Sequence, residues 1–231
     1  MGALQIIYHF SAAEDAGATF VISLDPASLA LQHPPRSALP AWTRLEHHQC
    51  PDCPLAKTGT TDCPMAEVLV DLQDFSGHLD SFKPLTVTVT TPEREMRTVV
   101  PAQRAFSSLM GLLIATSACP EVAWLRPMAR FHLPMASEEE TIYRATSMYM
   151  LAQYFRHQAG AVPDLSLAGL RARYQRLHQI NVAMAARLCS SLDKDASVNA
   201  VVLLDLFAKA MPYSVADSVA ELEYLFRAYI D

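Results

Sequence analysis

The sequence has little charge and no long hydrophobic run. Charged residues make up 18% of the 231 residues and apolar residues 51%, with only 7 glycines. This composition excludes the highly charged, weakly hydrophobic profile of a disordered chain and predicts a globular protein with a sizeable core. No stretch reaches about 18 consecutive apolar residues, so a standard transmembrane helix is not expected.

An excess of positive charge is also missing. The formal net charge of −6 and the isoelectric point near 5.7 argue against a protein that coats nucleic acid or an anionic membrane. The first residues, MGALQIIYHFSAAEDAG, lack the basic region and cleavage site of a secretory signal and do not match the myristoylation pattern. We therefore expect a cytoplasmic protein that binds neither nucleic acid nor membranes and keeps its cysteines reduced.

The common motifs of catalytic sites are absent. The sequence contains no GxxxxGK[ST], GxGxxG, GxSxG or HExxH, so nothing supports a phosphate-binding loop, a dinucleotide-binding turn, a hydrolase elbow or a zinc-protease helix. Residues 50–53 resemble half of the zinc-deaminase signature, but no HxE stands upstream. The sequence therefore leaves open whether the protein is an enzyme.

Hydrophobic periodicity predicts an α+β fold whose first part, residues 1–100, is a small N-terminal antiparallel sheet with a cysteine loop. Short β-branched and aromatic runs, and one segment that alternates with period two, indicate the strands. An amphipathic helix is predicted over residues 65–82, directly after the third cysteine. The predicted strands are residues 6–10, 19–24, 85–91 and 98–100.

Helical patterns dominate from Pro101, which suits the first position of a helix. Residues 101–231 are predicted to form a bundle of about five helices that makes one cooperative domain with the first part. Ser137 and Glu140 have the spacing of a capping box. The last two predicted helices either close the core or form the seam of a homo-oligomer. The predicted helices are residues 101–117, 137–158, 166–190, 198–209 and 214–230.

The strongest chemical signal is the segment HHQCPDCPLAKTGTTDCP, residues 47–64. Cys50 and Cys53 have the spacing with which two thiolates hold one metal ion through a tight turn. Cys63 supplies a third thiolate, and Gly59 allows the chain to fold back before it. A tetrahedral site then needs one more ligand.

Two residues compete for the fourth position. His47 lies in the same loop, three positions before Cys50, and would complete a local site. Cys119 is distant in sequence, but it shares the Cys-Pro dipeptide of the other three and would tie the N-terminal half to the helical half. A proline after a ligand removes an amide donor and stiffens the turn. The sequence does not decide between them.

The identity of the metal is open as well. The nearby histidines favour zinc, whereas four thiolates favour a [4Fe–4S] cluster. A redox-active dithiol is a further alternative, although Pro54 follows Cys53 at once and no helix is predicted before Cys63, unlike a thioredoxin-type motif. A loop without a special role is the remaining interpretation. Cys189 lies in a helical run and is expected to pack as a buried apolar side chain.

A second group of polar residues lies between residues 116 and 144. One hypothesis is that Arg130 and His132 line a pocket beside the metal and bind an anion or act in acid–base chemistry. The alternative is structural: Arg130 pairs with Glu138 or Glu139 at the start of a helix, and His132 is a satisfied interior histidine.

Four stretches carry a resemblance to a known family. An uncharacterised bacterial family described as a domain of unknown function resembles the sequence at LEHHQCPDCPL, AFSSLMGLLIATSACP, RPMARFHLPMASEEETIYRATSMYMLAQYF and VNAVVLLDLFAKAMP. The resemblance implies no activity, cofactor or substrate. It does imply that the cysteine loop and residues 119–143 belong to one type of protein rather than to two fused modules.

These observations predict a bacterial, cytoplasmic metal-binding protein with one cysteine-rich zinc site that is structural or regulatory. The alternatives are an iron–sulfur redox or sensor protein and an enzyme that uses a pocket near Arg130 and His132. The predicted metal ligands are Cys50, Cys53, Cys63 and Cys119, with His47 as the alternative fourth ligand.

Overall fold

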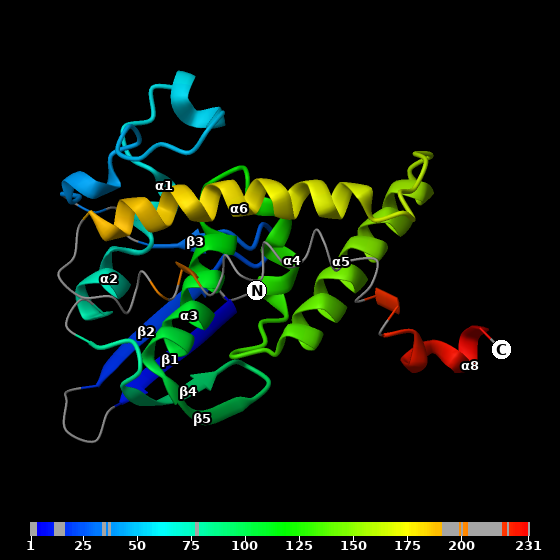
Figure 1. Cartoon of the computed structure of the whole chain (residues 1–231), viewed down its shortest axis with the longest axis horizontal. Coiled ribbons are helices and arrows are strands. Elements are labelled where there is room, and N and C mark those ends of the chain that lie inside the picture. Colours follow the sequence, from blue (N-terminus) through cyan, green and yellow to red (C-terminus); the bar gives the residue numbers. More distant parts are fainter. Residues whose placement is uncertain are drawn as a thin grey trace.

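A computed structural model of the chain contains an antiparallel five-stranded sheet with helices packed on one of its faces (Figure 1). This arrangement confirms the predicted α+β fold. No helix in the described ranges is both long and apolar enough to cross a membrane. The structure describes residues 4–11, 17–33, 36, 38–76, 79–190, 199, 201–202, 219–220 and 222–230.

The sheet has the strand order β3-β2-β1-β4-β5, and every neighbouring pair is antiparallel. In the central strand β1, Tyr8 lies opposite Phe20 on one side and Val89 on the other. Every second side chain of β1 and β4 is buried, so one face of the sheet packs on the core and the other faces solvent. The strands are β1 Leu4–Ser11, β2 Ala18–Leu24, β3 Leu31–Gln32, β4 Pro84–Thr90 and β5 Glu95–Pro101.

The cysteine loop and two short helices are inserted between β3 and β4. The helices are α1, Pro64–Glu67, and α2, Val70–Ser76. The prediction of one continuous helix over residues 65–82 is therefore wrong. The helix is interrupted at residues 68–69, and residues 79–82 are not helical.

The second half of the chain is helical, as predicted. The capping box of Ser137 is present, because its hydroxyl accepts from the Glu140 N–H and the Glu140 carboxylate accepts from the Ser137 N–H. Pro101 is the residue before α3 rather than its first residue. The helices are α3 Ala102–Thr116, α4 Arg126–Arg130, α5 Glu138–Gln158, α6 Ala168–Cys189 and α8 Arg227–Ile230.

The predicted helices at residues 198–209 and 214–230 fall mostly outside the described residues. Within the described part, residues 201–202 are helical, and a short 3₁₀ turn at Glu223–Phe226 leads into α8. The prediction that these segments close the core or form an oligomeric seam stays a prediction.

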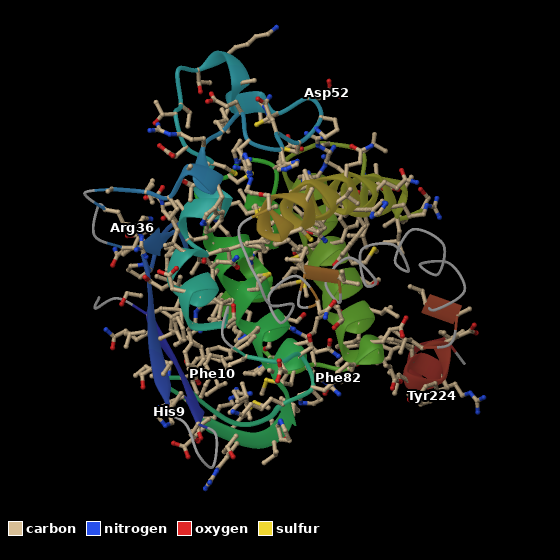
Figure 2. The ribbon with its side chains drawn as sticks, turned by 60° about the vertical axis from the view of Figure 1, so that its left-hand side comes forward. His9, Phe10, Arg36, Asp52, Phe82 and Tyr224 are labelled. Carbon is tan, nitrogen blue, oxygen red and sulfur yellow. The ribbon has the colours of Figure 1, made fainter. Side chains whose placement is uncertain are left out.

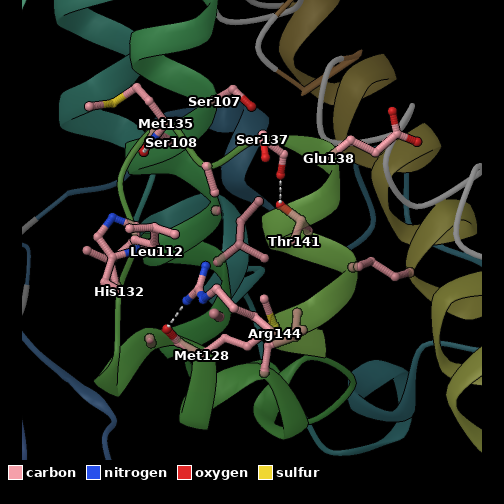
Figure 3. A pocket seen from close by; sticks show the side chains of 18 of the residues that line it. Ser107, Ser108, Leu112, Met128, His132, Met135, Ser137, Glu138, Thr141 and Arg144 are labelled. Carbon is pink, nitrogen blue, oxygen red and sulfur yellow. Dashed lines mark hydrogen bonds between the residues drawn. The ribbon is translucent and has the colours of Figure 1, made fainter. Parts of the chain in front are cut away.

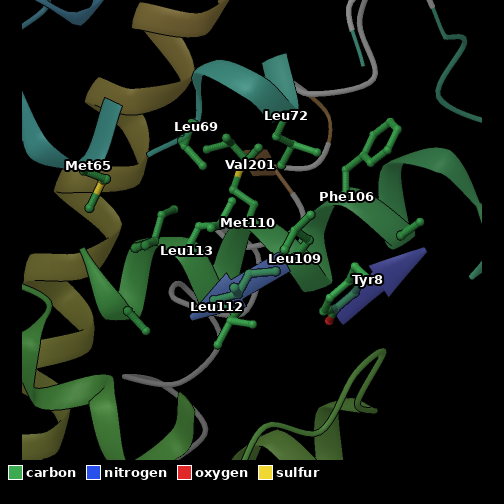
Figure 4. Close-up of a cluster of buried hydrophobic side chains, with 14 of the residues drawn as sticks. Tyr8, Met65, Leu69, Leu72, Phe106, Leu109, Met110, Leu112, Leu113 and Val201 are labelled. Carbon is green, nitrogen blue, oxygen red and sulfur yellow. The ribbon is translucent and has the colours of Figure 1, made fainter. Parts of the chain in front are cut away.

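The core is built around α3, which is buried along most of its length. Figure 4 shows Tyr8 of the sheet, Leu72 of α2 and Phe106 and Leu109 of α3 in one cluster. This cluster takes side chains from both sides of residue 101, the boundary that the sequence predicts between the two parts. A second cluster, which includes Tyr149 and Leu170, packs α5 against α6.

The central position of α3 makes its buried leucines sensitive to truncation. We expect Leu109→Ala to lower the free energy of unfolding by about 2–5 kcal/mol, because it leaves a cavity in the densest part of the core. Leu151→Ala, on the exposed surface of α5, is expected to change it by less than about 0.5 kcal/mol. Urea unfolding followed by circular dichroism measures both, and equal losses would contradict this description of the core.

Candidate metal centre

The cysteine loop, residues 45–62, begins and ends at one place. The Cys63 N–H donates to the Thr43 carbonyl at 2.7 Å, and the Leu45 N–H donates to the Thr61 carbonyl at 2.9 Å. Arg44 and Asp62 face each other between these bonds and form an ion pair at 3.7 Å. This neck, residues 43–45 with 61–63, closes the loop by backbone pairing and places Cys63 at its base.

The Cys-Pro dipeptides have a structural role at the helix starts. Cys53 directly precedes a 3₁₀ helix, Pro54–Lys57, and Cys63 directly precedes α1. In both cases the proline takes the first helical position, where its fixed φ angle fits and its missing N–H is not needed. Neither thiol caps the helix that follows it. Both sulfur atoms therefore remain available for another partner.

Residues 50–53 form a tight turn. Asp52 adopts a left-handed conformation with φ of 49°, which aspartate tolerates better than most residues. The turn brings the Cys50 and Cys53 thiols into hydrogen-bond contact. Figure 2 shows Asp52 in the loop that projects beyond the helices.

Cys119, in the turn after α3, lies beside the loop cysteines. Burial, with smaller contributions from the nearby Cys63, Cys50 and Cys53, raises the pKa of Cys119 to about 12. Burial likewise raises the pKa of Cys50 to about 11, with Cys53 and Cys63 as further causes. The Glu121 N–H donates a hydrogen bond to the Cys119 sulfur. The fold thus gathers four cysteines from two distant segments, Cys50, Cys53, Cys63 and Cys119, which we call the cysteine cluster.

The cluster consists of free thiols without coordination geometry. Cys50, Cys53, Cys63 and Cys119 are all free cysteines. Across the ranges that the structure describes, no three His, Cys, Asp or Glu side chains are arranged so as to hold a metal ion. The zinc and [4Fe–4S] assignments therefore stay predictions. Cys189 is exposed at the end of α6, so the expectation that it is buried is wrong.

His47, the alternative fourth ligand, contacts the end of α6. Its Nε2 lies 2.7 Å from the Ser190 hydroxyl oxygen, and its ring stands edge-on to His48 with centroids 4.7 Å apart. Burial lowers the pKa of His47, and the nearby His48 and Arg187 lower it further. One of its two ring nitrogens is therefore already engaged.

Arg187 of α6 is a buried cation at the neck of the loop. It is 2% exposed, and its guanidinium donates to the carbonyls of Trp42 at 2.7 Å, Arg44 at 2.5 Å and Leu45 at 3.3 Å. Within the described part of the chain no carboxylate forms an ion pair with it. Burial lowers its pKa, whereas the proximity of Cys63, Cys50 and Cys53 raises it. The cluster thiols are thus the acidic groups that act on this buried charge.

Arg176 connects the two segments that supply the cysteines. Its Nε lies 2.6 Å from a carboxylate oxygen of Glu121, two residues after Cys119. Its Nη2 donates to the Asp52 carbonyl, inside the turn of residues 50–53, at 3.2 Å. The sequence interpretation missed both arginines. Their spacing of 11 residues, about three helical turns, places them on one face of α6 and was the available signal.

Arg130 and His132 are separated in the structure. Arg130 pairs with Glu93 at 3.7 Å and stacks over the Phe131 ring, so the expected pairing with Glu138 or Glu139 is wrong. His132 borders a cavity of about 540 Å³, shown in Figure 3, whereas Arg130 is not among the described residues that line it.

His132 is partly buried, and its Nε2 lies 2.5 Å from the Tyr8 hydroxyl oxygen. Burial and, to a smaller extent, the nearby Arg144 lower the pKa of His132 to about 3. The ring is therefore neutral and forms a hydrogen bond with Tyr8. This contact joins α4 and its following turn to the central strand of the sheet.

Most of the chain matches the sequence pattern of a single protein family. Residues 6–227 match the model described as Domain of unknown function (DUF6901). No significant match is found among curated proteins or solved structures.

The low pKa of His132 makes stability depend on pH. The imidazole of His132 takes up a proton near pH 3 in the folded chain and near pH 6.5 in the unfolded chain. As the pH falls below 6.5, protonation therefore favours the unfolded chain, and the free energy of unfolding decreases. Between pH 7 and pH 5 we expect the wild type to lose roughly 2 kcal/mol more stability than His132→Gln. Urea unfolding at both pH values measures the difference, and the exposed His157→Gln should behave as the wild type. An unchanged pH profile in His132→Gln would contradict a neutral, partly buried His132.

Proposed function

The chain belongs to the DUF6901 family, and we propose that it is a metal-binding protein whose cysteine cluster holds one zinc ion in a structural or regulatory site. The proposed ligands are Cys50, Cys53, Cys63 and Cys119.

The observation that carries this proposal is the buried charge of Arg187. With all four thiols protonated, its guanidinium has only carbonyl partners, and an uncompensated buried cation is costly. Four thiolates and one Zn²⁺ sum to a net charge of about −2. A site of that charge, directly beside Arg187, would supply the missing counter-charge.

The surroundings of the cluster also suit thiolate ligands. The Glu121 N–H already donates to the Cys119 sulfur, and hydrogen bonds of this kind support thiolates that bind a metal. Neither Cys53 nor Cys63 uses its thiol to cap the helix that follows it. Binding would require the four sulfurs to lose their protons and converge at about 2.3 Å from the metal, a change that the free-thiol structure has not made.

Cys119 is favoured over His47 as the fourth ligand. The Cys119 thiol interacts with all three loop cysteines, whereas Nε2 of His47 contacts Ser190. A ligand set of four thiolates also accommodates a [4Fe–4S] cluster, which is the second candidate. In either case the bound group would fasten the loop to the turn after α3 and so contribute to folding stability.

The first test is metal content. Protein purified without air is expected to contain about one zinc ion per chain, measured by mass spectrometry of the elements, and to be colourless. Cys119→Ser should lose the metal, whereas His47→Ala and the exposed Cys189→Ser should retain it. A brown protein with iron and sulfide would establish the iron–sulfur alternative. Less than about half an equivalent of any transition metal would overturn the proposal.

The second test concerns the counter-charge. Arg187→Gln is expected to weaken zinc binding at least about tenfold, because a positive charge beside an anionic site is lost. Arg171→Gln, on the same helix, is the matched control and should bind as the wild type. Competition with a chromophoric chelator measures the affinities, and circular dichroism establishes that each variant is folded. If Arg187→Gln is folded and binds zinc as tightly as the wild type, Arg187 does not act as the counter-charge of the site.

A further inference from the structure

The cavity beside His132 has the size of a small-molecule site. Its volume of about 540 Å³ falls within the range of about 300–1,000 Å³ that is typical of ligand pockets. It lies between α3, α4, α5 and α6, and none of the cluster cysteines is among the described residues that line it. Its walls are mainly apolar and include Leu112, Ile114, Leu125, Met128 and Leu177. It is therefore separate from the proposed metal site.

Arg144 of α5 offers a positive charge at this cavity. Its Nη2 donates to the carbonyls of Met128 at 2.8 Å and Phe131 at 2.9 Å, which fixes the guanidinium in place (Figure 3). Glu140, one helical turn earlier on α5, interacts with it electrostatically, but among the described residues no carboxylate lies within ion-pair distance of it. Its Nε and Nη1 have no protein acceptor in that part of the chain. Figure 3 shows the carboxylate of Glu138, which also borders the cavity, turned away from it.

Two buried polar side chains of α6 border the same cavity without a hydrogen-bond partner in the described structure. Tyr174 is 4% exposed and close enough to Arg144 for the two to interact electrostatically. Asn181 is 2% exposed. Seven residues separate them, so they lie on one face of the helix about 10 Å apart. Their polar atoms are not sealed from solvent, so they are open to the cavity and accessible to a ligand.

Most other polar side chains around the cavity are already paired. The Ser108 hydroxyl contacts Tyr8 at 2.8 Å and accepts from the Met135 N–H at 3.0 Å. Thr141 donates to the Ser137 carbonyl at 2.8 Å. His132 is neutral and engaged by Tyr8. Arg104, whose guanidinium donates to the Met135 carbonyl at 3.2 Å, and Ser107 also line the cavity. The polar groups left for a ligand therefore include Arg144, Tyr174 and Asn181 on α5 and α6, with Arg104 and Ser107 on α3.

We propose that this cavity binds an apolar monocarboxylate with a second hydrogen-bonding group at its far end. The carboxylate would accept hydrogen bonds from Arg144 and the Tyr174 hydroxyl, because a guanidinium with donors left unpaired is a preferred partner of a carboxylate. The apolar body would lie against the wall formed by α3 and α4. The far polar group would pair with the Asn181 amide. Gly111 in the middle of α3 borders the cavity, and its lack of a side chain leaves room for such a body.

The experiment uses the full chain with decanoate and ω-hydroxydecanoate as probes, and decanol and decylammonium as neutral and positively charged controls. At about 100 times its dissociation constant, each carboxylate is expected to raise the melting temperature by about 5–10 °C. The two controls should have little effect. The ω-hydroxy acid should bind more tightly than decanoate. Equal binding of decanoate and decanol would overturn the proposal.

Two variants assign the residues, and calorimetric titration measures their affinities. Arg144→Gln should weaken decanoate binding at least about tenfold, whereas Arg156→Gln, on the exposed surface of α5, should not. Asn181→Leu should not lower the melting temperature of the free protein, since its amide makes no hydrogen bond in the described part of the chain. It should also abolish the advantage of the ω-hydroxy acid.

These measurements distinguish a role of Arg144 and Asn181 in ligand binding from a role in stabilising the fold. A lower melting temperature of free Asn181→Leu, or equal decanoate affinities of the Arg144 and Arg156 variants, would overturn the proposal. Metal content should be unchanged in every variant, so a failure here is distinct from a failure of the proposed metal site.

Discussion

The carbonyls of Trp42, Arg44 and Leu45 all point at the guanidinium of Arg187, and the position of the cysteine loop depends on this interaction. The backbone around the neck does not join the sheet, and of these three acceptors the Arg44 carbonyl also accepts from the His47 N–H at 3.1 Å. Arg187 therefore fixes the base of the loop on the helix. Arg176 fixes its far turn by the same kind of contact, through Asp52. The closeness of Cys119 to the loop thiols is a result of these two attachments.

Helix α6 separates two polar regions. At about 100° per residue, Arg176 and Arg187 lie within about 20° of each other around the helix axis. Tyr174 and Asn181 lie about 120–160° away, on the opposite side. One face of the helix thus contacts the cysteine loop and the other borders the cavity. A shift or rotation of this single helix would change both regions together, which gives the fold a physical route for coupling them.

Local patterns in the sequence predicted the local structure well. The alternation of residues 85–91 and the capping box at Ser137 correspond to β4 and to the start of α5, because both signals depend on neighbouring residues. The interruption at residues 68–69 was missed, since apolar spacing continues across it. The partner of Arg130 was missed for a different reason: Glu93 lies in the turn between β4 and β5, and only the tertiary fold brings them together.

The candidate site was predicted in part. The repeated Cys-Pro dipeptide singled out Cys119, and the structure places its thiol among those of the loop. Charged residues on a long amphipathic helix usually face water, so nothing marked Arg187 as buried. The sequence also did not indicate the polar groups of the cavity. Whether a side chain has a hydrogen-bond partner depends on its neighbours in the fold and not on its residue type.

The closed neck of the cysteine loop affects which changes in loop length and sequence the fold can tolerate. The backbones of Thr43 and Cys63 are joined by a hydrogen bond, so the two ends of the intervening loop lie next to each other. The entropy of closing such a segment grows only slowly with its length. Insertions or deletions within it leave the path from β3 to α1 unchanged, so the segment can diverge while the sheet and helices keep their arrangement.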